Sequence, residues 1–259
     1  MDVHLKDLTF LYPNHDQPVL QGLTLDIPSG QFVAIIGQSG CGKSTLLRLL
    51  AGLLHPTQGQ ITFNGAVSNG RSRIHTVAWM AQSPALLPWL TAYQNVALAL
   101  RFARNGTPPL MSPEEALSRV GLGDYIHEYP QHLSGGMQQR VALARLLVQG
   151  ASIWLMDEPF SALDELTREN LSNTLLDLWQ WLKPTILWVT HHIYEVVRLA
   201  DRILVLSPRP AQIAADIGVE LPRPRDENHP RFATYVTQLR KSLFHANGQE
   251  SASNDWFNT

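Results

Sequence analysis

The chain has 259 residues, of which 44% are hydrophobic and 16% are charged, so it can bury a sizeable core and does not have the composition of a disordered chain. Twenty Lys and Arg residues against 22 Asp and Glu residues give a formal net charge of -2, which argues against a nucleic-acid-binding protein with a basic face. The single cysteine, Cys41, cannot form an internal disulfide, so a reducing compartment is the simpler expectation.

Apolar runs along the chain predict β-strands. The expected strands cover residues 3–12, 20–27, 32–36, 76–81, 153–156, 185–190 and 202–206. The continuous apolar run at 32–36 is typical of a strand that is covered on both faces. Leucines at helical spacing predict a helix over 43–54, which Pro56 ends.

The middle of the chain has a different pattern from its two ends. The segment at about 84–150 contains several prolines between helical patterns and no convincing strand. We interpret this segment as a helical subdomain inserted into an α/β domain with a mainly parallel sheet, which occupies residues 1–225. A C-terminal helical extension is expected at 226–246, and the Pro-Arg-Pro-Arg run at 222–225 is interpreted as a solvated linker without a role. The polar tail at 247–259 is expected to be disordered.

A phosphate-binding loop is predicted at 37–45, because the pattern G-x-x-x-x-G-K-[ST] stands here between an apolar strand and a helix. The glycines let successive backbone N–H groups point inward, and the helix N-terminus adds a partial positive charge. Lys43 can reach the β- and γ-phosphates of a nucleotide, and the Ser44 hydroxyl can complete the coordination of Mg²⁺. The residues expected to contact the nucleotide are Gly37, Gln38, Ser39, Gly40, Cys41, Gly42, Lys43, Ser44 and Thr45.

Cys41 lies inside this loop and has two interpretations. A thiol at a helix N-terminus can be reactive. We favour the other interpretation, in which Cys41 is a small residue that is tolerated where the backbone faces the phosphate.

Two carboxylates, Asp157 and Glu158, follow the apolar run at 153–156. Taken alone, such a pair is more often a solvated strand end. Beside a phosphate loop, however, Asp157 is expected to hold Mg²⁺ directly or through water, and Glu158 to polarise the attacking water. The two residues at the end of the strand can turn together into the site. The pair therefore favours hydrolysis over nucleotide binding alone.

The segment Leu133-Ser134-Gly135-Gly136-Met137-Gln138-Gln139-Arg140 closely resembles the LSGGQ signature of ABC-type ATPases, although Met137 stands where the commonest form has Gln. It precedes Asp157 at the spacing of that family, and the other family motifs match in order over about residues 3–207. The resemblance implies a P-loop NTPase (RecA-like) core with a mainly parallel sheet, an N-terminal antiparallel β subdomain and the inserted helical subdomain. It also implies ATP and Mg²⁺ as cofactors.

The same resemblance implies roles for residues that are far apart in the sequence. Tyr12 is expected to stack on adenine, Gln82 to sense Mg²⁺ and the membrane partner, and His191 to contact the γ-phosphate. The catalytic set is then Lys43, Gln82, Glu158 and His191, and the metal set is Ser44, Gln82 and Asp157. A further set is expected to complete the nucleotide pocket of a second copy in trans: Ser134, Gly135, Gly136 and Asp164. For the signature residues alone, an ordinary helix N-cap is the alternative.

His192 stands where an Asp often follows the histidine of this motif. Two adjacent histidines raise the possibility of a metal site. We disfavour it, because neighbouring strand residues point apart and no Cys or further His lies at ligand spacing. Motif position favours His191 as the residue that faces the γ-phosphate.

Residues 82–91, which begin at Gln82 and end at Thr91, and residues 207–210 resemble importer ATPases for nitrate, sulfonate, taurine and related small solutes. The resemblance implies a homodimer, peripheral on the cytoplasmic face of the inner membrane and docked at 82–91 against two integral membrane permease subunits. An external solute-binding protein would deliver the solute. Apolar side chains such as Trp89 suit this socket. Alternatively, they pack the helical subdomain onto the sheet.

No stretch of the sequence is expected to cross a bilayer, since the longest apolar candidate, 141–156, is interrupted by Arg145 and other polar residues. The pore is therefore expected in another polypeptide. The alternative function is a soluble ABC ATPase that acts on nucleic acid or ribosomes, but a second ATPase unit, a long coiled-coil insertion and a basic surface are all missing here. No nucleic-acid partner is expected. A P-loop kinase would leave the signature at 133–140 unexplained.

Replacing Lys43 by Ala should weaken ATP binding by about tenfold or more and abolish hydrolysis, because a hydrogen bond to a charged group contributes roughly 1.5–3 kcal/mol. Titration with ATP and a phosphate-release assay measure both effects, and Lys241→Ala is the control. Near-normal ATPase activity of the Lys43 variant would refute the phosphate-loop assignment.

Overall fold

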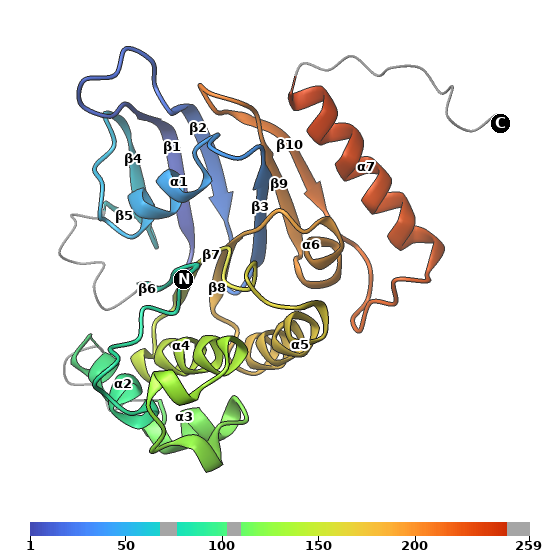
Figure 1. Ribbon diagram of the computed structural model, residues 1–259. Coiled ribbons are helices and arrows are strands. Elements are labelled where there is room, and N and C mark those ends of the chain that lie inside the picture. The colour runs from blue at the N-terminus through green and yellow to red at the C-terminus, as the bar shows by residue number, and fades with distance from the viewer. Residues whose placement is uncertain (68–76, 103–109, 248–259) are drawn as a thin grey trace.

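The computed structural model describes residues 1–67, 77–102 and 110–247, which form two β-sheets with helices around them (Figure 1). The strands are β1 (Val3–Phe10), β2 (Leu20–Ile27), β3 (Phe32–Gly37), β4 (Gln58–Phe63), β5 (Ala66–Val67), β6 (Val77–Met80), β7 (Ile153–Asp157), β8 (Thr185–Val189), β9 (Arg202–Leu206) and β10 (Ile213–Gly218). The α-helices are α1 (Lys43–Leu50), α2 (Ala92–Ala99), α3 (Pro113–Arg119), α4 (Gly135–Gln149), α5 (Glu165–Leu182), α6 (Ile193–Leu199) and α7 (Pro230–Ala246). Single 3-10 turns lie at Leu100–Phe102, Gly123–Tyr125 and Pro130–His132.

The larger sheet has six strands in the order β10-β9-β3-β8-β7-β6, and the smaller has four in the order β2-β1-β4-β5. In the larger sheet every pairing from β9 to β6 is parallel, and only β10 runs antiparallel, beside β9. All pairings in the smaller sheet are antiparallel. This architecture confirms the expected α/β class with a mainly parallel sheet and an N-terminal antiparallel sheet.

The two faces of the larger sheet belong to different hydrophobic cores, because successive residues of a strand point to opposite faces. Phe32, Ala34 and Ile36 of β3 join the core that α4, α5, α6 and α7 cover. Val33 and Ile35 join the core that α1 and the four-stranded sheet cover. Every residue of β3 except the last is buried, which explains its continuous apolar sequence.

The segment between β6 and β7 contains α2, α3 and α4 and, in its described residues, no strand. Figure 1 places these helices together at the lower left, below the larger sheet. Each helix has an N-cap residue whose hydroxyl oxygen accepts a hydrogen bond from the backbone N–H three residues later. These N-cap residues are Thr91, Ser112 and Ser134. In α2 and α3 the residue three positions after the cap is Gln or Glu, and its side chain accepts a hydrogen bond from the backbone N–H of the N-cap residue, which completes a capping box.

Some element ends differ from the sequence predictions. The helix α1 stops at Leu50, before the predicted residue 54, because Gly52 adopts a φ of 75°. The strand β1 ends at Phe10 rather than at residue 12. The short or partly polar strands β4, β5 and β10 were not predicted, because each depends on pairing with a neighbour more than on its own apolar pattern. The first residue of the predicted strand 76–81 lies outside the described residues.

The Pro-Arg-Pro-Arg run at 222–225 is not a solvated linker, so that interpretation was wrong. Arg225 is only 8% exposed, and its guanidinium donates to the carbonyl oxygens of Leu221, Val197, Ala200 and Val219. Arg223 donates to Asp201 Oδ1 at 2.7 Å and to the Leu199 carbonyl. The last carbonyls of a helix have no partner within it, so these arginines satisfy the C-terminal end of α6.

The helix α7 follows this run and packs on α6, β9 and β10. It extends from Pro230 to Ala246, within the C-terminal helical extension that the sequence predicts at 226–246. The proposed boundaries at 225 and 246 stay predictions, and 248–259, most of the tail expected to be disordered, lie outside the described residues. None of the helices in the described part of the chain is both long and apolar enough for a membrane span.

Replacing Arg225 by Ala should lower the free energy of unfolding by about 3 kcal/mol or more, because it leaves four buried carbonyl groups without their donor. Urea unfolding followed by circular dichroism measures the change. Arg240→Ala, on the exposed side of α7, is the matched control and should have little effect. Equal stability of the two variants would contradict a structural role for Arg225.

Candidate nucleotide-binding site

The phosphate loop connects β3 to α1 and lies at the carboxyl edge of the larger sheet. The ammonium group of Lys43 donates to the carbonyl oxygens of Gly37 at 2.9 Å and Gln38 at 3.0 Å. Lys43 is buried, so its positive charge lies within the loop. This placement fits a loop that binds a negatively charged phosphate chain.

Gly42 shows why the loop needs a glycine immediately before the helix. Its φ is 128°, a conformation that side chains rarely adopt. A Cβ at this position would lie 2.8 Å from Leu20 Cδ2 and 2.9 Å from Val19 Cγ1. The start of β2 therefore supports the loop from behind, at a distance that only glycine permits.

The hydroxyl of Ser44 donates to Asp157 Oδ1 at 2.9 Å, which joins the start of α1 to the end of β7. Burial raises the pKa of Asp157 above its ordinary value, against the hydrogen bond from Ser44 that lowers it. A hydroxyl and a carboxylate oxygen side by side are the hard oxygen ligands that Mg²⁺ prefers. The donor set therefore fits the expected metal.

Gln82, the third expected metal residue, is not joined to this pair. Its side-chain amide donates to Ser161 Oγ at 3.1 Å. Its backbone carbonyl oxygen accepts a hydrogen bond of 2.8 Å from the buried side-chain amide of Gln139. Gln82 thus connects the loop before α5 with α4, the helix that the signature opens. Among the described residues no hydrogen bond joins Gln82 to Ser44 or Asp157, and its role as a metal ligand stays a prediction.

Glu158 takes a left-handed backbone conformation with a φ of 46° just after β7. Its N–H donates to the carbonyl oxygen of Val189 at 2.9 Å, which holds it against the end of β8. Glu158 Oε2 lies 3.2 Å from Nδ1 of His191. The structure thus brings together the expected base and the expected γ-phosphate contact, which are 33 residues apart in the sequence.

The rings of His191 and His192 lie 4.2 Å apart at an interplanar angle of 35°, so these neighbours do not point apart as expected. The expectation was wrong because β8 ends at Val189, so the alternation of a strand no longer applies. His192 is the residue before α6 and donates its N–H to Thr190 Oγ1. Burial lowers the pKa of its imidazole.

Tyr12 lies beside the far end of the phosphate loop. Its hydroxyl is 3.3 Å from Oγ1 of Thr45, and its ring packs edge-on against Phe10 at 4.8 Å between centroids. Tyr12 is half-buried, so one side of its ring can face a base. Cys41 is buried within the core under the four-stranded sheet, a place that suits a small apolar residue.

The expected trans set lies at the N-termini of two neighbouring helices. Ser134 Oγ accepts from the N–H of Met137 at 3.3 Å, and Asp164 Oδ1 accepts from the N–H of Thr167 at 2.9 Å. That backbone hydrogen bond lowers the pKa of Asp164. A Cβ on Gly136 would meet Thr167 Cγ2 at 2.4 Å, so only glycine lets the two helix starts approach this closely. Among the described residues, no hydrogen bond connects either helix start with the phosphate loop.

Two site contacts were not predicted from the sequence. Arg209 donates through Nε to the carbonyl oxygen of Gly40 at 2.6 Å, from the loop between β9 and β10. Arg168 donates to the carbonyl oxygens of Phe160 and Leu163, just before α5. Arg209 belongs to a segment that the sequence singled out, but an arginine at a loop gives no sign of which carbonyl it will bind.

Known proteins are similar to this chain in sequence and in fold. The family described as "ABC transporter" matches residues 20–161. An aliphatic sulfonates import ATP-binding protein of Mesorhizobium japonicum is 45% identical, over 88% of this chain and 84% of its own. A protein of the same name from Rhodopseudomonas palustris is 44% identical, over 88% of this chain and 79% of its own length. A solved dimer of the ATP-binding cassette MJ0796 in a post-hydrolysis state, bound to ADP and Pi, has a TM-score of 0.74 at 32% identity and covers 85% of this chain and 99% of its own.

Proposed function

Because this chain belongs to the ABC transporter family of ATP-binding proteins, we propose that it is the ATP-hydrolysing subunit of an importer for a small solute of the nitrate, sulfonate and taurine class. The observation that carries the proposal is the meeting of Lys43, the Ser44–Asp157 pair and the Glu158–His191 pair at one edge of the sheet. The import function named for the relatives supports the direction of transport.

Each group at this edge has a role in the proposed hydrolysis. The loop N–H groups and Lys43 would hold the phosphates, and Ser44, Asp157 and Gln82 would hold Mg²⁺. The metal supplies positive charge that offsets the charge developing on the phosphate oxygens. Glu158 accepts a proton from the attacking water, and His191 both orients Glu158 and donates to the γ-phosphate. These roles are proposals that the geometry supports.

The proposed working form is a homodimer with ATP at the interface. Ser134 and Asp164, which begin α4 and α5, are exposed, and among the described residues neither has a hydrogen bond to the phosphate loop of its own chain. The N-terminus of α4, which Ser134 opens, can bind an anion. A second copy placed head to tail would bring Ser134, Gly135, Gly136 and Asp164 to the bound ATP. The dimeric assembly of the related cassette MJ0796 supports this arrangement.

The surface at 82–91 is the proposed contact with two integral membrane subunits. Trp89 is 69% exposed there. The backbone beneath it is fixed by the fully buried Asn95, whose amide donates to the carbonyl oxygens of Leu87 and Leu90. Arg145 from α4 binds Asn95 Oδ1 at 2.5 Å. An exposed aromatic side chain on a rigid support is a good anchor for a partner, since aromatic anchors dominate interface energies. The partner would place this chain at the cytoplasmic face of the membrane, with an external solute-binding protein acting indirectly.

A soluble ABC ATPase for nucleic acid or ribosomes stays the alternative. The net charge of -2 provides no electrostatic basis for it, and the relatives named for import favour the first proposal. Copurification of the chain from cells distinguishes the two functions. Membrane subunits should copurify with an importer ATPase, whereas ribosomes or nucleic acid should copurify with a soluble ABC ATPase.

Replacing Glu158 by Gln should lower kcat by about a hundredfold or more, since general-base catalysis contributes roughly 10²–10⁴-fold, while ATP binding persists. The uncleaved nucleotide should then trap the dimer, which light scattering can detect in saturating Mg-ATP. A variant that stays monomeric under those conditions would count against ATP as part of the interface.

Replacing Trp89 by Ala should leave the Kd for ATP unchanged and weaken assembly with the membrane subunits by about 2 kcal/mol or more, which is roughly thirtyfold in Kd. Pull-down of the membrane subunits at several concentrations measures this loss. Phe244→Ala, which removes another exposed aromatic side chain on α7, is the control. Equal assembly of both variants would contradict a docking role for Trp89.

A further inference from the structure

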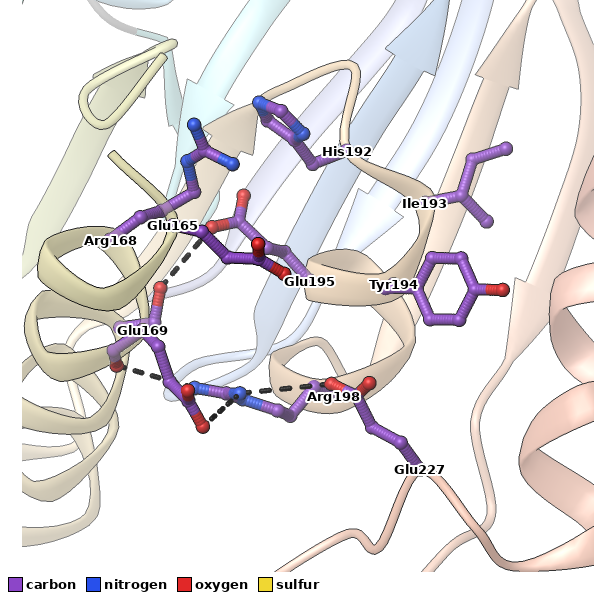
Figure 2. A pocket seen from close by; sticks show the side chains of 10 residues that line it. Glu165, Arg168, Glu169, His192, Ile193, Tyr194, Glu195, Arg198 and Glu227 are labelled. Carbon is purple, nitrogen blue, oxygen red and sulfur yellow. Dashed lines mark hydrogen bonds and ion pairs between the residues drawn. The ribbon is translucent and has the colours of Figure 1, made fainter. Parts of the chain in front are cut away.

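A cavity of about 410 Å³ lies between α5 and α6, immediately behind the turn at 190–192 that carries His191. Figure 2 shows the side chains of Arg168, His192 and Glu195 directed into the same space from α5, the turn and α6. None of these three belongs to the catalytic, nucleotide-binding or metal residues proposed above. Glu195 is the acidic group deepest in this arrangement, and hydrolysis as described so far does not use it.

The carboxylate of Glu195 reaches across the gap between the two helices. Oε1 accepts a hydrogen bond of 3.4 Å from the hydroxyl of Ser172, which is completely buried on α5. Oε2 is buried and has no hydrogen-bond partner among the described residues. The hydroxyl of Thr190, which also accepts the N–H of His192, favours the ionised form of this carboxyl. Through Ser172, Glu195 therefore connects α6, which follows the turn at 190–192, with α5.

Arg168 extends this connection to the loop before α5. Its Nε donates to the carbonyl oxygen of Phe160 at 3.3 Å, and its Nη2 donates to that of Leu163 at 2.5 Å. The same guanidinium is the strongest charge that favours an ionised Glu195. The loop at 160–164 ends in Asp164, one of the residues proposed to reach the ATP of a second copy. The hydrogen bond from Ser172 to Glu195 thus joins the helix that follows the trans loop to the helix that follows the turn of His191.

Burial raises the pKa of Glu195 to about 7, although Arg168, Ser172, Arg198 and Thr190 all act to lower it. The other charged groups around the cavity come from every neighbouring segment: Glu165 and Glu169 on α5, His192 in the turn, Arg198 on α6 and Glu227 before α7. In Figure 2 Arg198 lies between Glu169 and Glu227, at 3.1 and 3.7 Å, so its charge is largely shared with those carboxylates. Burial lowers the pKa of His192, so its ring adds little positive charge near neutral pH.

We propose that Glu195 is a positioning residue for ATP hydrolysis: its ionised carboxylate accepts the hydrogen bond from Ser172 and so holds α6, which follows the turn at 190–192, against α5, which follows the loop at 160–164, and its protonation loosens that hold. The inference rests on the proposed function, because it concerns the placement of His191 against Glu158. Glu195 does not touch the nucleotide. It acts through its contact with Ser172, and so should change kcat without changing the KM for ATP.

The two consequences of protonation have opposite signs. Hydrolysis depends on the ionised form and should fall as the pH drops through 7. Stability behaves in the other direction, because a carboxyl whose pKa is raised on folding stabilises the fold below its unfolded pKa of 4.5 and loses that contribution as the pH rises through about 7. Ionised Glu195 is thus a group that the fold disfavours and the reaction needs, as is common at functional sites.

The test compares the full-length wild type with Glu195→Gln, which keeps the shape of the side chain and removes its charge. At saturating Mg-ATP, the ratio of wild-type kcat to variant kcat should fall by up to about tenfold from pH 8 to pH 6, because the ionised fraction of a group with a pKa near 7 changes by that factor. Taking the ratio cancels the pH effects that the two proteins share. At pH 8 the variant should be slower yet unfold at a higher temperature than the wild type.

Two further variants make the result decisive. Glu227→Gln alters the rim of the same cavity and should follow the wild type at every pH. Ser172→Ala removes a donor to the carboxylate and should move the midpoint of the pH profile upward, which keeps the proposal testable should the Gln variant not fold. A kcat ratio that is constant within about twofold from pH 6 to pH 8, or an unchanged midpoint in Ser172→Ala, would overturn it.

Glu158→Gln, assayed in parallel, separates this inference from the proposed function. If Glu158→Gln is inactive while Glu195→Gln follows the wild type at every pH, only the positioning role of Glu195 fails. If Glu158→Gln hydrolyses ATP like the wild type, the proposed catalytic residues fail and Glu195 loses its role with them.

Discussion

The hydrogen bond from Ser44 to Asp157 is the contact on which the site depends, because it joins two strands that are not neighbours in the sheet. β8 lies between β3 and β7, so this bond passes over the end of β8. The carbonyl oxygen of Val189, the last residue of β8, receives the N–H of Glu158. The three strand ends are thereby held at one edge, as is usual for ligand sites of parallel sheets. His191 reaches Glu158 only because β8 stands in the middle.

The same geometry supports the proposal that the chain contains half of a site. The phosphate loop and its carboxylates come from strands of the larger sheet, while the helix starts at Ser134 and Asp164 are linked to each other through Gly136 and Thr167. A pair of helix starts can bind an anion with little rearrangement, because their N–H groups are already oriented. Closure of two copies on ATP then needs rigid movement more than refolding. The contact of Gln82 with Ser161 and Gln139 connects the proposed membrane-facing segment to both helix starts.

The helix that follows His191 is held at both ends. At its start, Thr190 and His192 form the turn, and at its end Arg223 and Arg225 bind the last carbonyl groups. A buried guanidinium is costly, and burial lowers the pKa of Arg225 to about 10, but it stays charged at neutral pH. It is tolerated because four carbonyl oxygens accept its N–H groups. Glu195, between these two ends, lacks such complete pairing, and burial raises its pKa to about 7.

The sequence by itself determined the class of fold, the phosphate loop and the order of the motifs, because these depend on local patterns: an apolar run, glycines before Lys43, and a helix after it. It also predicted most elements, since buried parallel strands carry a continuous apolar signal. Only the tertiary structure decided how the motifs meet. Strand order placed His191 beside Glu158. The left-handed backbone at Glu158 and the end of β8 set the directions of their two side chains. Carbonyl groups at the end of α6 bind Arg223 and Arg225, which ties the run at 222–225 to that helix. Such contacts join residues far apart in the chain, so no local pattern encodes them.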